Sequence, residues 1–277
     1  MAFPFFPPDD DPGPSFSELL RRSGLAPAVP TEKLEGVTHG TTVIAIRYAD
    51  GVVMAGDRRA TSGHLISHRT MEKVYPADRH SGVAIAGAAG PAMEMVKLFQ
   101  LQLEHYEKVE GTELSLEGKA NQLSAMVRGH LPAAMQGMAV VPLFAGYDLR
   151  RGAGRLFQYD VTGGRYEEAD FATTGSGSLH AGTVIKIGYR QGMTREETLD
   201  LGIQALFQAA DEDSATGGPD LVRGIYPTMA TITGEGFQSV TDDEIATRFR
   251  GLLDRLATTE STATVGDTPS MAKGERS

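Results

Sequence analysis

The stretch Gly40-Thr-Thr-Val-Ile-Ala-Ile-Arg-Tyr-Ala-Asp-Gly-Val-Val-Met-Ala55 joins a proline-rich leader to the first regularly patterned part of the chain. Residues Thr41 to Tyr48 alternate between two sets of side chains, which is typical of a β-strand with two different faces. Asp50-Gly51 supplies turn residues, and Val52 to Ala55 returns as a second strand. The folded part of the chain is therefore predicted to open on a β-hairpin whose first strand begins at Thr41.

The elements that follow occur in groups and do not alternate strictly. Period-two patterns predict strands, and apolar residues three or four positions apart predict helices. The expected strands span residues 71–75, 83–86, 139–147, 154–161, 165–171, 226–233 and 237–240. The expected helices run from Pro91 through Met95, Phe99, Leu103 and Tyr106, from Ser115 to Pro132, and over residues 178–189, 194–210 and 241–256. This grouping indicates an α+β fold, with antiparallel sheets packed together and helices outside them.

Three zones of the chain differ in composition. Residues 1–40 are rich in proline and acidic residues and show little periodicity, which predicts a mostly flexible leader. Residues 41–256 are densely patterned and form the predicted domain. From Ala257 the chain consists largely of threonine, serine, glycine and charged residues, so residues 257–277 are expected to form a flexible tail.

Composition excludes several classes of protein. The formal net charge is −10 without a cluster of lysine and arginine, which argues against a nucleic-acid binder. Cysteine is absent, so neither a disulfide nor a cysteine nucleophile is possible. No apolar stretch approaches the length of a membrane span, and the acidic residues after the first apolar segment are unlike a secretory signal. We therefore expect a cytoplasmic protein without membrane association.

Common catalytic and cofactor motifs are missing. There is no nucleotide-binding glycine loop, and Gly175-Ser-Gly-Ser178 has the wrong spacing for a serine nucleophile elbow. The seven histidines are scattered without metal-ligand spacing, so no metal and no cofactor are expected. Lys73 alternates with Met71 and Tyr75 in an expected strand and should point inward with them. Because a buried ammonium is costly without a partner, Lys73 indicates a buried carboxylate nearby.

Six segments in this order resemble the proteasome β-type subunits, most closely the bacterial, actinobacterial kind with a long leader. They are Gly40-Thr41-Thr42, Gly56-Asp-Arg-Arg-Ala-Thr61, Lys73, Gly87-Ala-Ala-Gly90, Gly175-Ser-Gly-Ser178 and Asp213-Ser-Ala-Thr-Gly-Gly218. The resemblance covers residues 41–256. It implies the N-terminal-nucleophile hydrolase fold, which is a four-layer αββα sandwich of two antiparallel sheets between helix layers.

The resemblance also implies an activity and a set of partners. The expected activity is that of a threonine endopeptidase that hydrolyses unfolded proteins inside a closed chamber. The expected assembly is an α7β7β7α7 stack of homo-heptameric β rings flanked by rings of a separate α-type subunit. A ring-shaped ATPase unfoldase would deliver protein substrates through the α ring.

The expected chemistry starts with autocatalytic cleavage between Gly40 and Thr41, which removes residues 1–40 as a propeptide. A threonine hydroxyl needs an adjacent base, and cleavage frees the Thr41 α-amine, whose pKa of about 7.7–8.0 lies close to working pH. By resemblance, Asp57 orients Lys73, the Lys73 charge favours the free amine, and the Gly87 N–H serves as the oxyanion donor. Ser176, Asp213 and Thr216 would support the amine, with Thr216 standing where many family members have serine.

The resemblance also suggests where substrate binds. An extended peptide would pair with the backbone at Thr61 and Ala89, by addition of a β-strand. Ala60, Ile85 and Ala89 would line the pocket for the residue before the cut. Because these side chains are apolar, we expect a preference for apolar residues at that position.

Three other interpretations compete with this one. The two-ring bacterial protease whose chain begins Thr-Thr usually has a minimal leader and Gly-Asp-Gly-Gln where Gly56-Asp-Arg-Arg59 stands here. A non-catalytic ring subunit would be expected to lack Thr41, Asp57 or Lys73, and all three are present. A small-molecule amidase could share the nucleophile without forming rings, and the mass of the assembly with an α-type subunit would distinguish it.

Overall fold

The computed structural model describes residues 40–265, with side chains up to residue 258. The first of its two five-stranded sheets has the strand order β10-β1-β2-β11-β12, and its pairings are antiparallel. Its strands are β1 (Thr42–Tyr48), β2 (Gly51–Gly56), β10 (Phe171–Gly175), β11 (Thr228–Thr233) and β12 (Gly236–Ser239).

The second sheet has the order β5-β6-β7-β8-β9 and is also antiparallel. Its strands are β5 (Val74–Asp78), β6 (Ser81–Gly87), β7 (Val140–Asp148), β8 (Ala153–Tyr159) and β9 (Arg165–Glu168). A separate two-stranded hairpin is formed by β3 (Ala60–Ser62) and β4 (Leu65–His68). This hairpin was not predicted from the sequence, and its second strand is short and exposed.

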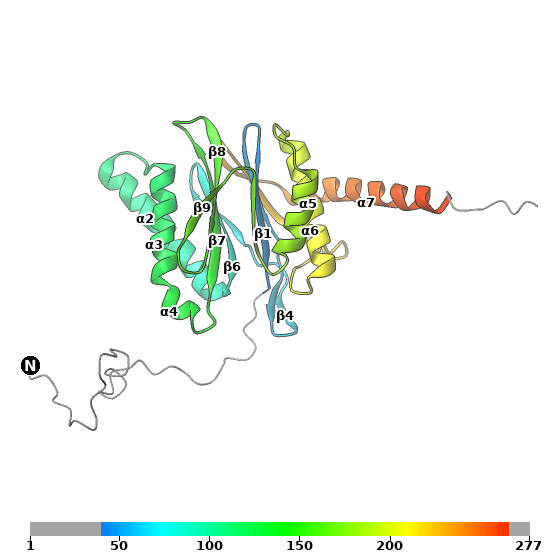
Figure 1. Cartoon of the computed structure of the whole chain (residues 1–277), viewed down its shortest axis with the longest axis horizontal. Coiled ribbons are helices and arrows are strands. Elements are labelled where there is room, and N and C mark those ends of the chain that lie inside the picture. Colours follow the sequence, from blue (N-terminus) through cyan, green and yellow to red (C-terminus); the bar gives the residue numbers. More distant parts are fainter. Residues whose placement is uncertain (1–39, 266–277) are drawn as a thin grey trace, which may run out of the picture. The chain divides into compact units, whose positions relative to one another are not determined.

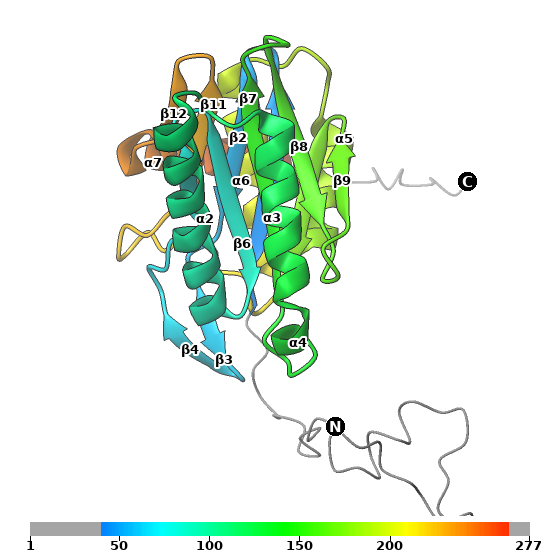
Figure 2. The same ribbon diagram turned by 90° about the vertical axis from the view of Figure 1, so that its left-hand side faces the viewer.

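Helices cover the outer faces of both sheets, which gives four layers (Figure 1). Figure 2 shows α2 and α3 lying over the second sheet. The helices on that side are α2 (Ala89–Glu110), α3 (Leu116–Gly129) and the short α4 (Leu131–Ala134). On the side of the first sheet lie α5 (Ser178–Gly188) and α6 (Arg195–Glu212), with α7 (Asp242–Val265) against α6. The predicted four-layer αββα sandwich is confirmed.

Strand β1 is buried on both faces, and its two alternating sets of side chains pack in two different layers. Ile44 and Ile46 pack with residues of α5 and α6, whereas Val43 and Ala45 pack between the two sheets. Both faces of the strand are therefore apolar, and burial of these side chains stabilises the stack of layers. Thr194 caps the N-terminus of α6 with the expected capping box. Its side chain accepts a hydrogen bond from the Glu197 N–H, and the Glu197 side chain accepts one from the Thr194 N–H.

Strand register brings the start of β1 next to two loops from distant parts of the sequence. Thr42 pairs with Gly175 of β10, and Val43 pairs with Gly56 of β2. The residues that follow these partners, Ser176 and Asp57, therefore lie beside the Gly40-Thr41 junction. The fold thus brings to one end of the first sheet the Asp57 segment, which is close to Thr41 in sequence, and Ser176, which lies 135 positions after Thr41.

Several predictions about elements were wrong in detail. Lys73 precedes β5 and does not lie within a strand, so alternation is not the reason for its burial. The single strand expected over residues 165–171 is two strands, because β9 ends the second sheet and β10 crosses to the first. Tyr106, expected on the buried stripe of α2, is 37% exposed, while Met95, Phe99 and Leu103 are buried as expected.

The flexible tail expected from Ala257 was also wrong in its first part, since α7 continues to Val265. No glycine or proline interrupts the sequence between Gly251 and Gly266, so nothing breaks the helical hydrogen bonding there. The remaining tail residues, 266–277, and leader residues 1–39 lie outside the described part of the chain. Within residues 40–265, no helix is both long and apolar enough to cross a membrane.

Candidate active site

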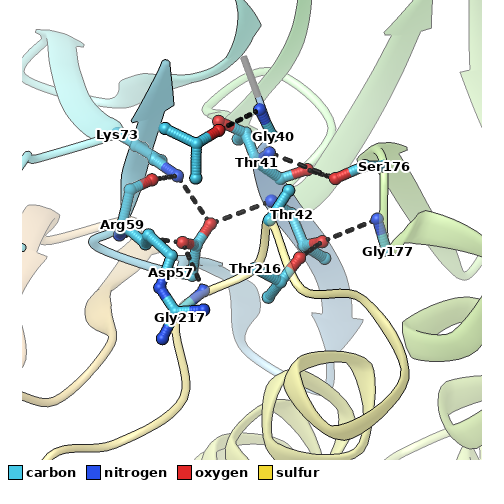
Figure 3. A network of polar contacts seen from close by, with 12 residues as sticks. Gly40, Thr41, Thr42, Asp57, Arg59, Lys73, Ser176, Gly177, Thr216 and Gly217 are labelled. Carbon is cyan, nitrogen blue, oxygen red and sulfur yellow. Dashed lines mark hydrogen bonds and ion pairs between the residues drawn. The ribbon is translucent and has the colours of Figure 1, made fainter. Parts of the chain in front are cut away.

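Asp57 lies at the centre of a buried polar network just beyond β2 (Figure 3). Its side chain is inaccessible to solvent, and one carboxylate oxygen accepts hydrogen bonds from the Lys73 ammonium at 2.7 Å and from the Thr42 N–H at 2.9 Å. The other oxygen accepts from the N–H groups of Arg59 and Gly217, each at 2.9 Å. Four donors around one carboxylate satisfy both of its oxygens and fix its orientation.

Lys73 is held from two sides and is 1% exposed. Besides the Asp57 carboxylate, its ammonium donates to the Arg59 carbonyl at 2.6 Å. Burial lowers the pKa of Lys73, although the adjacent Asp57 carboxylate opposes that shift. An ammonium has three N–H donors, so one remains after these two bonds. Thr41 lines the same small cavity as Lys73.

Thr41 is connected on its other side to Ser176 and Asp213. The Thr41 N–H donates to Ser176 Oγ at 3.3 Å, and the Ser176 N–H donates to the Thr41 carbonyl at 2.8 Å. The Ser176 hydroxyl donates to the Asp213 carboxylate. Burial raises the pKa of Asp213, but hydrogen bonds from Ser176, Thr216 and the Ala215 N–H outweigh it and lower that pKa below its ordinary value. Hydrogen bonds thus connect the Thr41 N–H through Ser176 to the Asp213 carboxylate.

The Thr216 side chain contacts Thr42 and Asp213, and among the hydrogen bonds of the described residues none joins Thr216 to Thr41. Its hydroxyl donates to Asp213 at 2.6 Å and lies 2.6 Å from Thr42 Oγ. Since Thr216 uses its one proton on Asp213, Thr42 must donate to Thr216, and the Gly177 N–H donates to Thr42 Oγ at 3.0 Å. The Thr42 and Thr216 hydroxyls therefore each have one acceptor, and these bonds fix the position of Thr42 at the start of β1.

A small cavity opens beside Thr41. It is lined by Gly40, Thr41, Ala60, Met71, Lys73, Ile85, Ala86, Gly87, Ala89 and Ala92. The walls away from Thr41 and Lys73 are apolar, so the cavity suits an uncharged side chain. Gly87 has a positive φ of 110°, and a Cβ on it would lie 2.1 Å from the Ala139 carbonyl oxygen, so only glycine fits there.

Comparison with known proteins places the chain in a family. A family model described as "Proteasome subunit" matches residues 37–222. The chain belongs to the proteasome family, as a subunit of the bacterial β type. It is 56% identical to a protein named "Proteasome subunit beta" from Acidimicrobium ferrooxidans, over 89% of this chain and 92% of the relative. It is 59% identical to one of the same name from Streptomyces griseus, over 78% and 77% respectively.

Family membership confirms the coarse functional predictions. Proteasome β subunits are proteases, and they assemble with α subunits into a proteasome core. The predicted resemblance to the bacterial β type is thereby confirmed, and the two-ring bacterial protease loses its support. The particular residues that carry out catalysis are a separate question, which the geometry of this site addresses.

The expected catalytic residues of the proteasome subunit lie together. Thr41, Ser176, Asp213 and Thr216 form one hydrogen-bonded group, which Thr42 joins to the Asp57–Lys73 pair. Ala60, Ile85, Gly87 and Ala89 line the adjacent cavity. Thr61 is absent from that lining; its hydroxyl accepts a hydrogen bond from the Gly40 N–H at 3.2 Å. Among residues 40–265 no group of histidine, aspartate or glutamate side chains could hold a metal ion.

Sequence reasoning missed three residues that organise this site. Thr42 bonds Asp57 and Thr216, and Arg59 supplies both a carbonyl to Lys73 and an N–H to Asp57. Gly217 provides the fourth donor to Asp57, and a Cβ on it would lie 2.7 Å from Arg59 Cβ. Each lies in a segment that the sequence had singled out, but backbone donors carry no sequence signal of their own.

Proposed function

We propose that this chain is the catalytic β subunit of a 20S-type proteasome core and acts as a threonine endopeptidase after cleavage between Gly40 and Thr41. The observation that carries the proposal is the position of Thr41. It lies between the Lys73–Asp57 ion pair and the Ser176–Asp213 pair, and it lines a small apolar cavity. Residues 1–40 are then a propeptide, and residues 41–256 are the catalytic domain.

Activation begins with an attack by Thr41 on its own preceding peptide bond. Thr41 Oγ bonds to the Gly40 carbonyl carbon, the bond from that carbon to the Thr41 nitrogen breaks, and the hydroxyl proton passes to the nitrogen. Water then hydrolyses the resulting ester, which leaves a carboxylate on Gly40 and a free amine and hydroxyl on Thr41. The chain thus makes its own base, because an amide nitrogen cannot accept a proton usefully and an amine can.

In the cleaved subunit the same residue attacks substrate. The Thr41 amine takes the hydroxyl proton as Oγ bonds to the peptide carbonyl, and it then passes that proton to the leaving amine. The positive charge of Lys73, held by Asp57, lowers the proton affinity of the amine. The Gly87 N–H donates to the developing oxyanion. Water hydrolyses the acyl ester and restores Thr41, while Ser176, Asp213 and Thr216 hold the amine in place.

Substrate preference follows from the cavity beside Thr41. The side chains of Ala60, Ile85 and Ala89, which line the cavity, are hydrocarbon, so an apolar side chain before the cut would bury its surface without leaving an unpaired charge. Thr61 and Ala89 would hold the extended peptide through their backbone groups. We therefore propose cleavage after apolar residues of unfolded proteins.

The assembly around this site extends the proposal. Homo-heptameric β rings stacked as α7β7β7α7 would enclose the Thr41 sites, and a ring ATPase acting through the α ring would supply unfolded chains. Neither nucleic acid nor membrane takes part, and the cytoplasm is the expected location.

Co-expression with an α-type subunit tests the proposal. Intact mass should show a chain that begins at Thr41, and the purified particle should hydrolyse peptides with an apolar residue before the cut. A monomer-sized species with amidase activity would favour the small-molecule amidase instead. An assembled particle that remains inactive after processing would favour the non-catalytic subunit.

A further inference from the structure

Gly40, the residue before the proposed cut, has no room for a Cβ atom, because Ala215 occupies that position. It is buried, and a Cβ built on it would lie 1.7 Å from Ala215 Cβ, 2.7 Å from Ala215 Cα and 2.9 Å from the Ala215 oxygen. All three nearest atoms belong to Ala215. A separation of this size requires a shift of backbone, because Ala215 has no flexible side chain that could move aside.

The loop that carries Ala215 is held by the active-site carboxylates. The Ala215 N–H donates to Asp213 at 3.1 Å, and the Gly217 N–H donates to Asp57 at 2.9 Å. Just before Ala215, the Ser214 carbonyl accepts from the Arg59 guanidinium at 2.8 Å. Ala215 therefore cannot retreat from Gly40 without displacing groups that orient Thr41 and Lys73.

The other side of the contact is fixed as well. The Gly40 N–H donates to the Thr61 hydroxyl, and the Thr41 carbonyl accepts from the Ser176 N–H. Thr42 is paired to Gly175 in the sheet and to Asp57 through its N–H. The junction is thus tied to the sheet on one side while the Ala215 loop is tied to the carboxylates on the other.

Ala215 is separate from the cavity that would take substrate side chains. The cavity walls include Ala60, Ile85 and Ala89, and Ala215 is not among its lining residues. A side chain at position 40 would therefore meet Ala215 before it met any cavity wall. Two different surfaces therefore act on the residue before a cut. The Ala215 loop limits the size of residue 40 in the leader, and the cavity walls select the corresponding side chain of a substrate.

We propose that Ala215 is the specificity-determining residue that restricts the last position of the leader to glycine. This inference rests on the proposed self-cleavage at Gly40-Thr41 and extends it. A larger residue at position 40 pushes against the Ala215 loop and moves the carbonyl carbon out of reach of Thr41 Oγ. Enlarging the space at position 215 should therefore permit a larger residue at position 40.

Rates of leader release from the full chain, mixed with an α-type subunit and followed by intact mass, test this inference. Gly40→Ala should slow release about tenfold to a hundredfold, which is the usual effect of overpacking a fixed site. Ala215→Gly with Gly40 intact gives the reference rate for the double variant. The double variant G40A/A215G should recover part of the lost rate, because the shortest contact, at 1.7 Å, is removed while Ala215 Cα and O still lie 2.7 and 2.9 Å from the added Cβ. G40A combined with Ala49→Gly in the exposed β1–β2 turn should remain slow.

Each result decides the inference. Rescue by A215G but not by A49G supports it, because a merely structural role for Ala215 would make the double variant slower than either single one. Release from G40A at the wild-type rate, or a double variant no faster than G40A, would overturn it. If the wild-type chain keeps its leader in the same mixture, the proposed self-cleavage itself fails.

Discussion

The Lys73 ammonium lies 2.7 Å from the Asp57 carboxylate, and both side chains are almost completely shielded from solvent. A buried pair of this kind is expensive to form, since both charges lose their hydration. Its four additional backbone contacts, from Thr42, Arg59 and Gly217 to Asp57 and from Lys73 to the Arg59 carbonyl, offset part of that cost. The pair therefore joins β1, the Arg59 segment and the loop after α6 at one point.

Breaking this pair from one side should destabilise the domain. Lys73→Met leaves the Asp57 charge buried without its cation, and the free energy of unfolding should fall by about 3–5 kcal/mol. Urea unfolding measures the change. Lys108→Met, which removes the exposed i,i+4 partner of Glu104, is the matched control and should change stability very little. Equal effects of the two substitutions would contradict the structural role of the buried pair.

Replacement of the nucleophile should separate its chemistry from folding. Thr41→Ala removes the hydroxyl, so both leader release and peptide hydrolysis should be abolished, while thermal unfolding should change little. Thr41→Ser keeps the hydroxyl and should retain part of both activities. Intact mass and a fluorogenic peptide assay give the two readouts. Leader release from the alanine variant would show that another residue or another protease makes the cut.

Substrate preference should follow the apolar walls of the cavity. Peptides with leucine or phenylalanine before the cut should have higher kcat/KM than matched peptides with glutamate or lysine, because a charge there would be buried without a partner. Purified particles and three peptides that differ only at that position are sufficient. Faster cleavage of the acidic or the basic peptide would contradict the assignment of Ala60, Ile85 and Ala89 to this pocket.

Acid should weaken the contribution of Asp213. Its pKa is lowered in the folded protein, so the carboxylate stabilises the fold above its unfolded pKa of about 4, and this contribution is lost as the pH falls through the lowered folded value. Asp213→Asn cannot titrate there. The difference in Tm between wild type and D213N should therefore shrink as the pH is lowered from 6 towards 3. A difference that stays constant over that range would contradict the lowered pKa.

The sequence predicted the layers well because both faces of each central strand are apolar and the helices carry clear stripes. It placed Lys73 inside the fold correctly but for the wrong reason, since the residue precedes β5 and is drawn inward by Asp57. The contacts of Thr42 and Gly217 were out of reach, because they depend on register and on backbone N–H groups. Ala215 was equally hidden: an alanine in a loop has meaning only once the loop is seen against Gly40.

The most direct measurement of the central claim is the N-terminus of the subunit in active particles assembled with an α-type partner. The account predicts that intact mass and N-terminal sequencing find a chain beginning at Thr41, and that chains keeping residues 1–40 hydrolyse no peptide. Active particles whose β subunits still carry Gly40 on Thr41 would contradict it, because the amine base would then be absent.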